Sequence, residues 1–348
     1  MARNRNKSKN VNIVAKDSVH VINLSSYTSP QVIENPRKDY IEYGDDNQYF
    51  KYLIDRYNGS ATNNAAINGI SEMIYGRGLD ASDSKDKPEA YEQMKSLFTK
   101  ECMKKVCYDY KMMGQAAVQV IYTKDRTKVF EVEHMPIETL RAEKAIEGKV
   151  RAYYYHPKWE DIKKDDDPKR ISAFGMSKDG IEILYIRPYK AGFYYYSPVD
   201  YQGGLQYAEL EEEIGNYHIN NIQNGLQPSM LINFNNGTPN KEQRDEIERA
   251  IYEKFSGTSN AGKFILAFND SKELAASIEP VTIPDAYQQY EFLANESMTK
   301  VMVSHRIVSP MLVGIKDKTG LGNNADELKQ ASILFDNMVI RVQQEYIL

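Results

Sequence analysis

A long helical pattern near the end of the chain constrains the fold most strongly. Residues 284–310, PDAYQQYEFLANESMTKVMVSHRIVSP, carry apolar or aromatic side chains at intervals of three and four, which is the spacing of one face of an α-helix. About 25 helical residues would span roughly 37 Å. A helix of that length crosses a domain or connects two. His305 lies on its apolar stripe, which is typical of a histidine in a core or an interface.

A second helical segment precedes this one, and a small unit is inserted between them. Residues 207–226, YAELEEEIGNYHINNIQNGL, have a narrow apolar stripe, and Glu209 and Glu211 to Glu213 are expected in the first turn, where carboxylates favour the helix dipole. SMLINF and KFILAF are predicted strands. The segment between them, TPNKEQRDEIERAIYEKFSG, is a predicted helix with Thr238 as its N-cap and Pro239 at its first position. This order predicts a strand-helix-strand unit between two long helices.

The preceding region, from about residue 40 to 210, mixes predicted helices and strands. DNQYFKYLIDRYNGSATNNAAINGISEMIYGRGL is predicted to form two helices separated at residues 58–60, and YEQMKSLFTKECMKKVCYDYKMMG is a helical stretch that ends at Gly114. Segments rich in Tyr, Val and Ile are predicted strands: AAVQVIYT, KVFEVEHM, VRAYYYHP, IEILYIRPY and AGFYYYSP. The aspartates of the loop KKDDDPKR are expected to be solvated rather than bound to a metal.

Composition and charge disfavour several classes of protein. No apolar run approaches the roughly 18 residues of a membrane span, and the basic N-terminus has no apolar segment behind it, so we expect a cytoplasmic chain without a membrane contact. The net charge of −5 disfavours a strong nucleic-acid binder, because such binding depends on Lys and Arg that neutralise phosphates. The exception is the tail, where four basic residues precede the first acid, Asp17: Arg3, Arg5, Lys7 and Lys9. We expect this tail to be either a solvated arm or a contact for an acidic partner.

Two glycine-rich segments match nucleotide-binding motifs only in part. Gly257-x-x-x-x-Gly262-Lys263 is one residue short of a P-loop, since Phe264 stands where Ser or Thr would bind magnesium, and a strand rather than a helix is predicted to follow. Residues 320–325, GLGNNA, fit a dinucleotide fingerprint but are followed by helix alone. The His and Cys residues have no metal-ligand spacing, and no G-x-S-x-G motif occurs. We therefore predict no enzyme, cofactor or metal site, with a nucleotide-binding enzyme that uses Gly257 to Lys263 as the alternative.

Tyrosine is unusually frequent, with 26 Tyr against 11 Phe. Strands favour aromatic residues, and Tyr is also enriched at protein interfaces. Since the long apolar stripes cannot all be buried within one chain, the sequence favours association.

The ordered set of segments resembles the portal proteins of tailed bacteriophages, particularly the family related to lambdoid and Bacteroides-phage portals. The segments that carry the resemblance are YIEYGDDNQYFKYLIDRYNGSATNNAAINGISEMIYGRGL, NIQNGLQPSMLI, SNAGKFIL, HRIVSPMLVGI and KTGLGNNADE. The resemblance spans about residues 35–348, and the order of the segments, rather than any single motif, makes it specific.

The resemblance implies an α+β fold with the domain order of a portal. Its parts would be a flexible basic arm (1–35), a mixed α/β wing (36–206), stem helix 1 (207–227), a clip (228–282), stem helix 2 (283–310), a tunnel loop (311–325) and a helix connecting the wing to a crown (326–348). A crown normally follows that helix, so the resemblance implies that the crown is absent or the chain truncated.

The resemblance also implies a function and a set of partners. The protein would form a ring, usually of twelve copies, at one capsid vertex of the virion after assembly in the host bacterial cytoplasm. Double-stranded DNA would pass through this channel during packaging and ejection. The other partners would be the terminase large subunit, the major capsid or scaffolding protein and a head-tail adaptor. Another virion structural or adaptor protein is the alternative.

Three sets of site residues are carried over from the resemblance. The DNA channel would be lined by the tunnel-loop residues Lys316, Lys318, Thr319, Gly320, Gly322, Asn323 and Asn324. The clip residues that dock terminase or adaptors would be Lys241, Arg244, Glu248 and Lys263. The subunit interface would include Tyr287, Tyr290 and His305.

Overall fold

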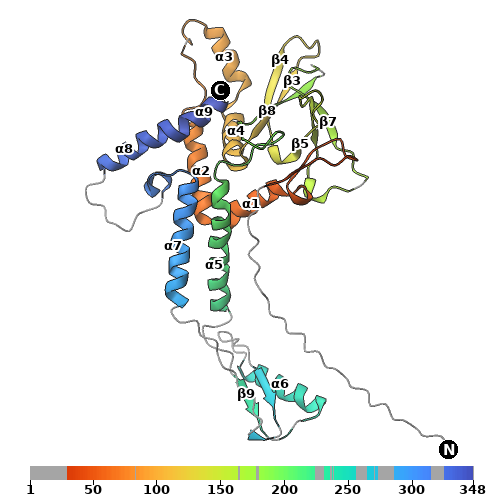
Figure 1. Ribbon diagram of the computed structural model, residues 1–348, viewed down its shortest axis with the longest axis vertical. Coiled ribbons are helices and arrows are strands. Elements are labelled where there is room, and N and C mark those ends of the chain that lie inside the picture. The colour runs from red at the N-terminus through yellow and green to blue at the C-terminus, as the bar shows by residue number, and fades with distance from the viewer. Residues whose placement is uncertain are drawn as a thin grey trace, which may run out of the picture.

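The computed structural model describes residues 30–347 apart from 83, 164, 178–179, 224–230, 236, 238, 256–264, 270, 273–285 and 315–324. The fold is α+β, as predicted. Figure 1 shows a broad body, two helices (α5 and α7) that project from it side by side, and a small unit around α6 beyond their far ends. We call α5 and α7 the helix pair, and β9, α6 and β10 the distal unit.

The body begins with a short hairpin and two helices in sequence. β1 (Val32–Ile33) pairs antiparallel with β2 (Glu42–Tyr43), and α1 (Tyr49–Gly59) and α2 (Ala61–Tyr75) follow. The predicted break between the helices is confirmed. Ser60 has an extended backbone and caps α2 by accepting a hydrogen bond from the backbone N–H of Asn63 at 3.1 Å.

The second predicted helical stretch forms two helices rather than one. α3 (Pro88–Leu97) and α4 (Lys100–Met113) are separated at Thr99, whose hydroxyl accepts a hydrogen bond from the backbone N–H of Cys102 at 3.2 Å. Gly114 ends α4 with a φ of 75°, as expected for a helix C-terminus. A Cβ there would lie 2.9 Å from the Pro198 carbonyl group, so only glycine fits.

A six-stranded sheet with the order β4-β3-β8-β7-β6-β5 forms the other layer of the body. All neighbours are antiparallel except β7 and β8. The strands are β3 (Ala116–Tyr122), β4 (Val129–Met135), β5 (Leu140–Ala142), β6 (Ala152–Tyr155), β7 (Lys169–Ala173) and β8 (Ile181–Ile186). Four of the five predicted strands are confirmed, whereas β5 and β7 were not predicted. β7 begins within the segment KKDDDPKR, which was predicted as a loop.

The prediction of a strand at AGFYYYSP is wrong. This segment forms turns, and Gly192 has a φ of 84°. Tyr195 and Tyr196 instead enter the core, whereas Tyr194 stays exposed. The Tyr196 hydroxyl accepts from the N–H of Ala142 at 3.0 Å and donates to the carbonyl of Ile41 at 2.5 Å. The Tyr196 ring stacks on Tyr43 with centroids 4.3 Å apart. Part of the tyrosine excess therefore belongs to the core of a single protomer.

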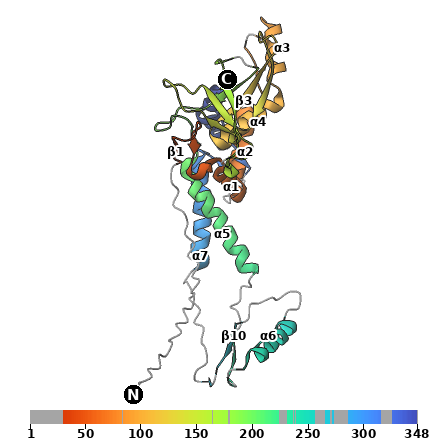
Figure 2. The same cartoon turned by 90° about the vertical axis from the view of Figure 1, so that its right-hand side faces the viewer.

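The helix pair consists of α5 (Leu205–Gln223) and α7 (Ala286–Ser304), which lie side by side in Figures 1 and 2. α7 ends six residues before the predicted end at residue 310. Arg306 has a φ of 59°, and its N–H donates to the carbonyl of Val303, so the chain turns away from the helix axis. α5 begins before Tyr207, so Glu209 and the acids after it do not lie in its first turn, which corrects that prediction.

The distal unit has the predicted strand-helix-strand order. β9 (Leu231–Phe234) and β10 (Ile265–Phe268) are parallel, and α6 (Lys241–Phe255) connects them. Thr238, the predicted N-cap, lies outside the described residues. The prediction of Pro239 at the first helical position is wrong, because α6 begins at Lys241. Asn240 and Gln243 form a reciprocal cap: the Asn240 side chain accepts from the N–H of Gln243 at 2.9 Å, and the Gln243 side chain accepts from the N–H of Asn240 at 3.2 Å.

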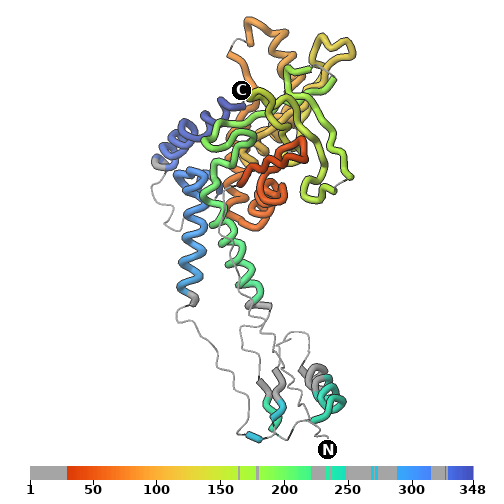
Figure 3. The backbone as a smooth tube through the Cα atoms, turned by 45° about the vertical axis from the view of Figure 1, so that its right-hand side comes forward, coloured from red at the N-terminus to blue at the C-terminus, as the bar shows by residue number. Residues whose placement is uncertain are grey.

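The chain finishes with the predicted helix, which packs on the body (blue in Figure 3). It consists of α8 (Ala325–Phe335), a π-helical segment η7 (Asp336–Ile340) and α9 (Arg341–Ile347). Its buried face packs against α2 and α4. In the part of the chain that is described, no helix is long and apolar enough to cross a membrane, and no group of three or more His, Cys, Asp or Glu is placed to hold a metal ion.

Ser60→Ala is expected to lower the free energy of unfolding by about 1–2 kcal/mol, because α2 loses its N-cap. The Ser60 hydroxyl also donates to Glu211, so the variant removes a link to α5 as well. Urea unfolding of both proteins measures the effect. Ser96→Ala, at an exposed serine of α3, is the matched control and should change stability by less than about 0.5 kcal/mol. Equal stability of the two variants would contradict the assigned role of Ser60.

Candidate functional site

The helix pair is held together by aromatic side chains near its far end. Tyr217 of α5 stacks on Tyr290 of α7 with ring centroids 4.5 Å apart, and the His218 ring meets Tyr290 at 5.7 Å in an edge arrangement. Other apolar side chains of the pair are not covered: Ile219 is 53% exposed and Phe292 is 65% exposed. The two helices alone leave these apolar side chains exposed to water, which is typical of a surface that contacts another protein.

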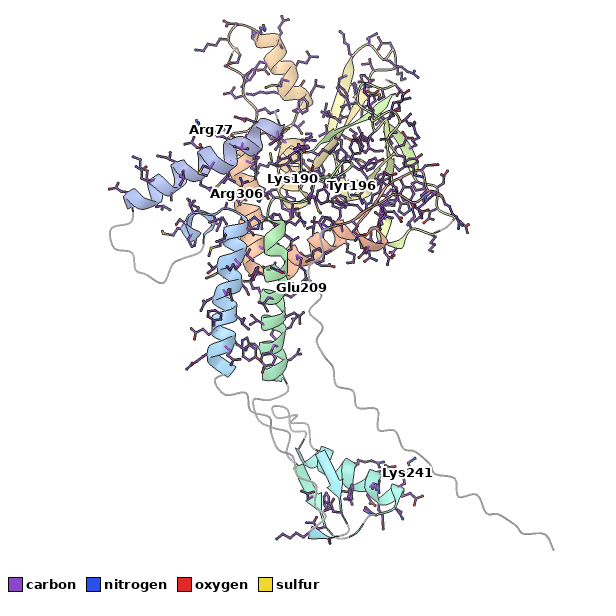
Figure 4. All side chains as sticks on the ribbon, in the orientation of Figure 1. Arg77, Lys190, Tyr196, Glu209, Lys241 and Arg306 are labelled. Carbon is purple, nitrogen blue, oxygen red and sulfur yellow. The ribbon has the colours of Figure 1, made fainter. Side chains whose placement is uncertain are left out.

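The near end of the pair is anchored by the acidic residues of α5. Arg56 of α1 contacts Glu209 at 3.5 Å and Glu212 at 3.0 Å, and Figure 4 labels Glu209 at this junction. Glu211 accepts hydrogen bonds from the hydroxyl of Thr62 at 2.8 Å and from its N–H at 3.3 Å. The Glu211 carboxylate therefore interacts with the N-terminus of α2 rather than with that of its own helix, and Glu209 and Glu212 pair with α1.

A second junction is built around Asp200, which lies just before α5. One carboxylate oxygen accepts from the ammonium of Lys111 on α4 at 2.8 Å. The other accepts from the Gln343 amide on α9 at 2.8 Å and from Arg306, directly beyond α7, at 3.3 Å. We call these four residues the Asp200 cluster (Arg306 is labelled in Figure 4). The Asp200 carboxylate thus connects the near end of the helix pair with α4 and α9.

The charges of the Asp200 cluster are strongly coupled. Burial acts to raise the pKa of Asp200, but the positive groups around it, Lys111 foremost, outweigh burial and lower the pKa to about 2. Burial lowers the pKa of Lys111, and Asp200 opposes that shift. The Lys111 side chain is completely buried, so its charge depends on this carboxylate as its partner.

His305 lies inside the protomer, which corrects its prediction as a subunit-interface residue. Its side chain is fully buried, stacks on Tyr201 with centroids 4.3 Å apart, and donates from Nε2 to the Asn63 side chain at 2.9 Å. Burial lowers the pKa of His305 well below its ordinary value, so the ring is neutral. The ring serves the packing of α7 on α2 and is not available to a neighbouring subunit.

Only some of the other predicted site residues lie in the described part of the chain. All predicted tunnel-loop residues, Lys263 and residues 1–29 of the predicted arm lie outside the described residues. The last part of the arm, predicted to extend to residue 35, contains β1 (Val32–Ile33). Lys241 is exposed at the start of α6 (Figure 4), and Glu248 lies on the same helix. Arg244 is partly engaged within the distal unit, since its guanidinium lies 5.7 Å from the Phe268 ring centroid. Tyr287 lies on α7, and Tyr290 packs within its own helix pair.

Little in the sequence indicates the Asp200 cluster. Asp200 is 89 residues from Lys111 and 143 from Gln343, so no local spacing connects them. The one available signal was a lysine between Tyr110 and Met112 at the end of an apolar helix. A lysine in such surroundings is rarely buried without a partner.

No protein-family model matches this sequence, and no curated protein matches it. The fold is similar to that of a chain in the virion of a native gene transfer agent (GTA) particle, with a TM-score of 0.57, 13% identity, and coverage of 91% of this chain and 80% of that chain. With the same coverage, it is similar to chains in the neck of an empty GTA particle computed with C6 symmetry (TM-score 0.58, 14% identity) and in the neck of a native GTA particle computed with C12 symmetry (TM-score 0.56, 13% identity). This chain therefore shares its fold with a component of these particles.

Proposed function

We propose that this chain is a portal protein, which forms a ring-shaped channel for double-stranded DNA at one vertex of a phage-like capsid. The observation that carries the proposal is the projecting helix pair, whose apolar side chains stay exposed in the single chain. In a ring, each pair would be the stem and would pack against its neighbours, which would remove Ile219 and Phe292 from water. The similar chains in GTA necks, determined with C6 and C12 symmetry, support such an assembly.

The charge of the chain suits a conduit better than a DNA-holding protein. Tight binding of DNA requires many Lys and Arg on the phosphates, whereas this chain has a net charge of −5. An acidic channel with a few basic and amide side chains, such as Lys316 and Asn323 in the proposed tunnel loop, would let DNA slide. The loop glycines Gly320 and Gly322 would permit backbone changes as the duplex moves.

The distal unit would be the clip, where other proteins of the particle dock. Lys241 and Arg244 project from α6, the only described helix of this unit, and would contact the terminase large subunit and later a head-tail adaptor. The nucleotide chemistry of packaging would belong to that motor, and this chain would have no enzymatic activity. Its place would be the virion, next to the major capsid or scaffolding protein.

The mass of the purified chain in solution tests the proposal. We expect closed assemblies of about a dozen copies of the 39.9 kDa chain, measured by mass photometry and sedimentation at several concentrations. A chain that remains monomeric at micromolar concentration would contradict the proposal. Negative-stain images of closed assemblies that lack an axial opening would instead indicate another structural component of the virion.

A further inference from the structure

Residues of α2, α4 and β4 line a groove on the body, and Figure 1 shows these elements away from the distal unit. It consists of two adjoining cavities of about 820 and 480 Å³, and both are lined by Lys105 and His134. β4 is an edge strand of the sheet, so its outer backbone groups take no part in the sheet's hydrogen bonds. This edge and the length of the two joined cavities suit an extended segment of chain.

The groove is lined by more acidic than basic side chains. Its carboxylates are Glu72, Glu101, Asp109, Glu131, Glu133 and Glu138. The basic side chains already have partners: Lys105 pairs with Glu101 at 2.6 Å, and Lys104 lies 5.4 Å from the Tyr75 ring centroid. His134 contacts Asp109 at 2.7 Å.

Three of these carboxylates form no ion pair with a described residue. In the described part of the chain, no cationic group lies within ion-pair distance of Glu72, Glu131 or Glu138. Burial raises the pKa of Glu138, and the neighbouring Asp109 adds to that shift, while His134 and Arg141 only partly oppose it. A cation bound in the groove would relieve both effects.

The part of the groove beside β4 also carries apolar side chains. Phe130 is 68% exposed, although it lies in a strand, and Leu97 of α3 lines the same cavity. The site therefore suits a segment in which basic residues are followed by apolar ones.

The N-terminal segment of this chain has that pattern. In MARNRNKSKNVNIVAK, four basic residues are followed by Val11, Ile13 and Val14, and no acid occurs before Asp17. The 29 residues that precede Pro30 can span at most about 100 Å when extended. That reach is sufficient to cross the body from β1 to the groove.

We propose that residues 3–14 bind in this groove of their own chain. The basic side chains bind the free carboxylates, and the apolar residues that follow contact Phe130 and Leu97. Because the segment is tethered, its effective concentration at the groove is in the millimolar range, and weak individual contacts suffice. This binding takes place within one chain and does not require ring assembly.

Trypsin cleavage of the full-length chain tests the proposal, because bound Arg and Lys residues are protected. In the triple variant Glu72→Gln, Glu131→Gln and Glu138→Gln, cleavage within residues 3–9 should accelerate about tenfold. The control, Glu89→Gln with Glu92→Gln on the exposed face of α3, should leave the rate unchanged. High salt should accelerate cleavage of the native chain but not of the triple variant. Equal rates in all three proteins at low salt would overturn the proposal.

A disulfide experiment identifies the chain that provides the segment. Asn12→Cys, between Val11 and Ile13, with Phe130→Cys should form a disulfide within one chain under mild oxidation, whereas Cys102 and Cys107 are buried. Disulfide-linked dimers, or no disulfide, would overturn binding within the same chain. Duplex DNA that protects residues 3–9 equally in the native chain and the triple variant would assign the segment to nucleic acid instead.

Discussion

Asp200→Ala is expected to lower the free energy of unfolding by about 3–5 kcal/mol, the usual cost of removing one partner from a buried ion pair. The substitution leaves the Lys111 ammonium completely buried without its carboxylate and also removes the acceptor of Gln343. Denaturant unfolding measures the change. The variant should also weaken the connection between the helix pair and the last helix, because the carboxylate contacts both sides.

A double variant distinguishes the stability lost through the unpaired charge from the stability lost through the missing contacts. Adding Lys111→Met to Asp200→Ala removes the buried ammonium and should restore at least half of the lost stability. A loss below about 1 kcal/mol for Asp200→Ala alone, or no recovery in the double variant, would contradict the role of the cluster. We expect Arg306→Ala to have a smaller effect, because that side chain is half exposed and exchanges its contact for water.

The ion pair of Asp200 and Lys111 also makes the stability of the protein depend on pH. The pKa of Asp200 in the folded protein is lowered to about 2, below the value of about 3.9 for an unfolded chain. Its stabilisation is therefore present above about pH 4 and is lost as the pH falls towards 2. The difference in stability between the native protein and Asp200→Ala should narrow over this range.

The exposed apolar side chains of the helix pair are expected to determine assembly. Phe292→Ser combined with Ile219→Ser is expected to weaken association of neighbouring copies by at least a hundredfold. Each side chain contributes about 1.5–3 kcal/mol if the proposed contact buries it, and the loss recurs at every interface of a ring. Mass photometry on dilution should show smaller species for this variant.

The folding of the single chain provides the control for this variant. Both side chains are exposed in the protomer, so the unfolding free energy should change by less than about 0.5 kcal/mol. Met176→Ser, at an exposed methionine in a turn of the body, is the matched apolar substitution and should leave assembly intact. Assemblies of unchanged size in the double variant would show that the helix pair does not form the interface.

The architecture could be predicted from the sequence where local periodicity determines it. The spacing of apolar residues predicted both helices of the pair, and the strands on either side of α6 predicted the distal unit. The break at Ser60 and the end of α4 at Gly114 follow from the same kind of local chemistry, a side-chain cap and a left-handed glycine. These features depend on residues within a few positions of each other.

The predictions that failed depend on distant contacts. AGFYYYSP has strong strand propensity. The segment nevertheless turns, because Tyr196 packs in the core on Tyr43, which is more than 150 residues away in the sequence. The carboxylates of α5 were assigned to their own helix, whereas Arg56 and the start of α2 bind them. The partners of Asp200 and His305 are equally remote, so no local pattern indicates them.

Electron microscopy of the purified chain shows directly whether it assembles into the proposed ring. If the chain is a portal protein, negative-stain images should show closed rings of about a dozen subunits with an axial hole, and side views should show a narrow projection formed by the helix pairs and distal units. Images that contain only compact single particles at micromolar concentration, from protein that circular dichroism shows to be folded, would contradict the proposed ring.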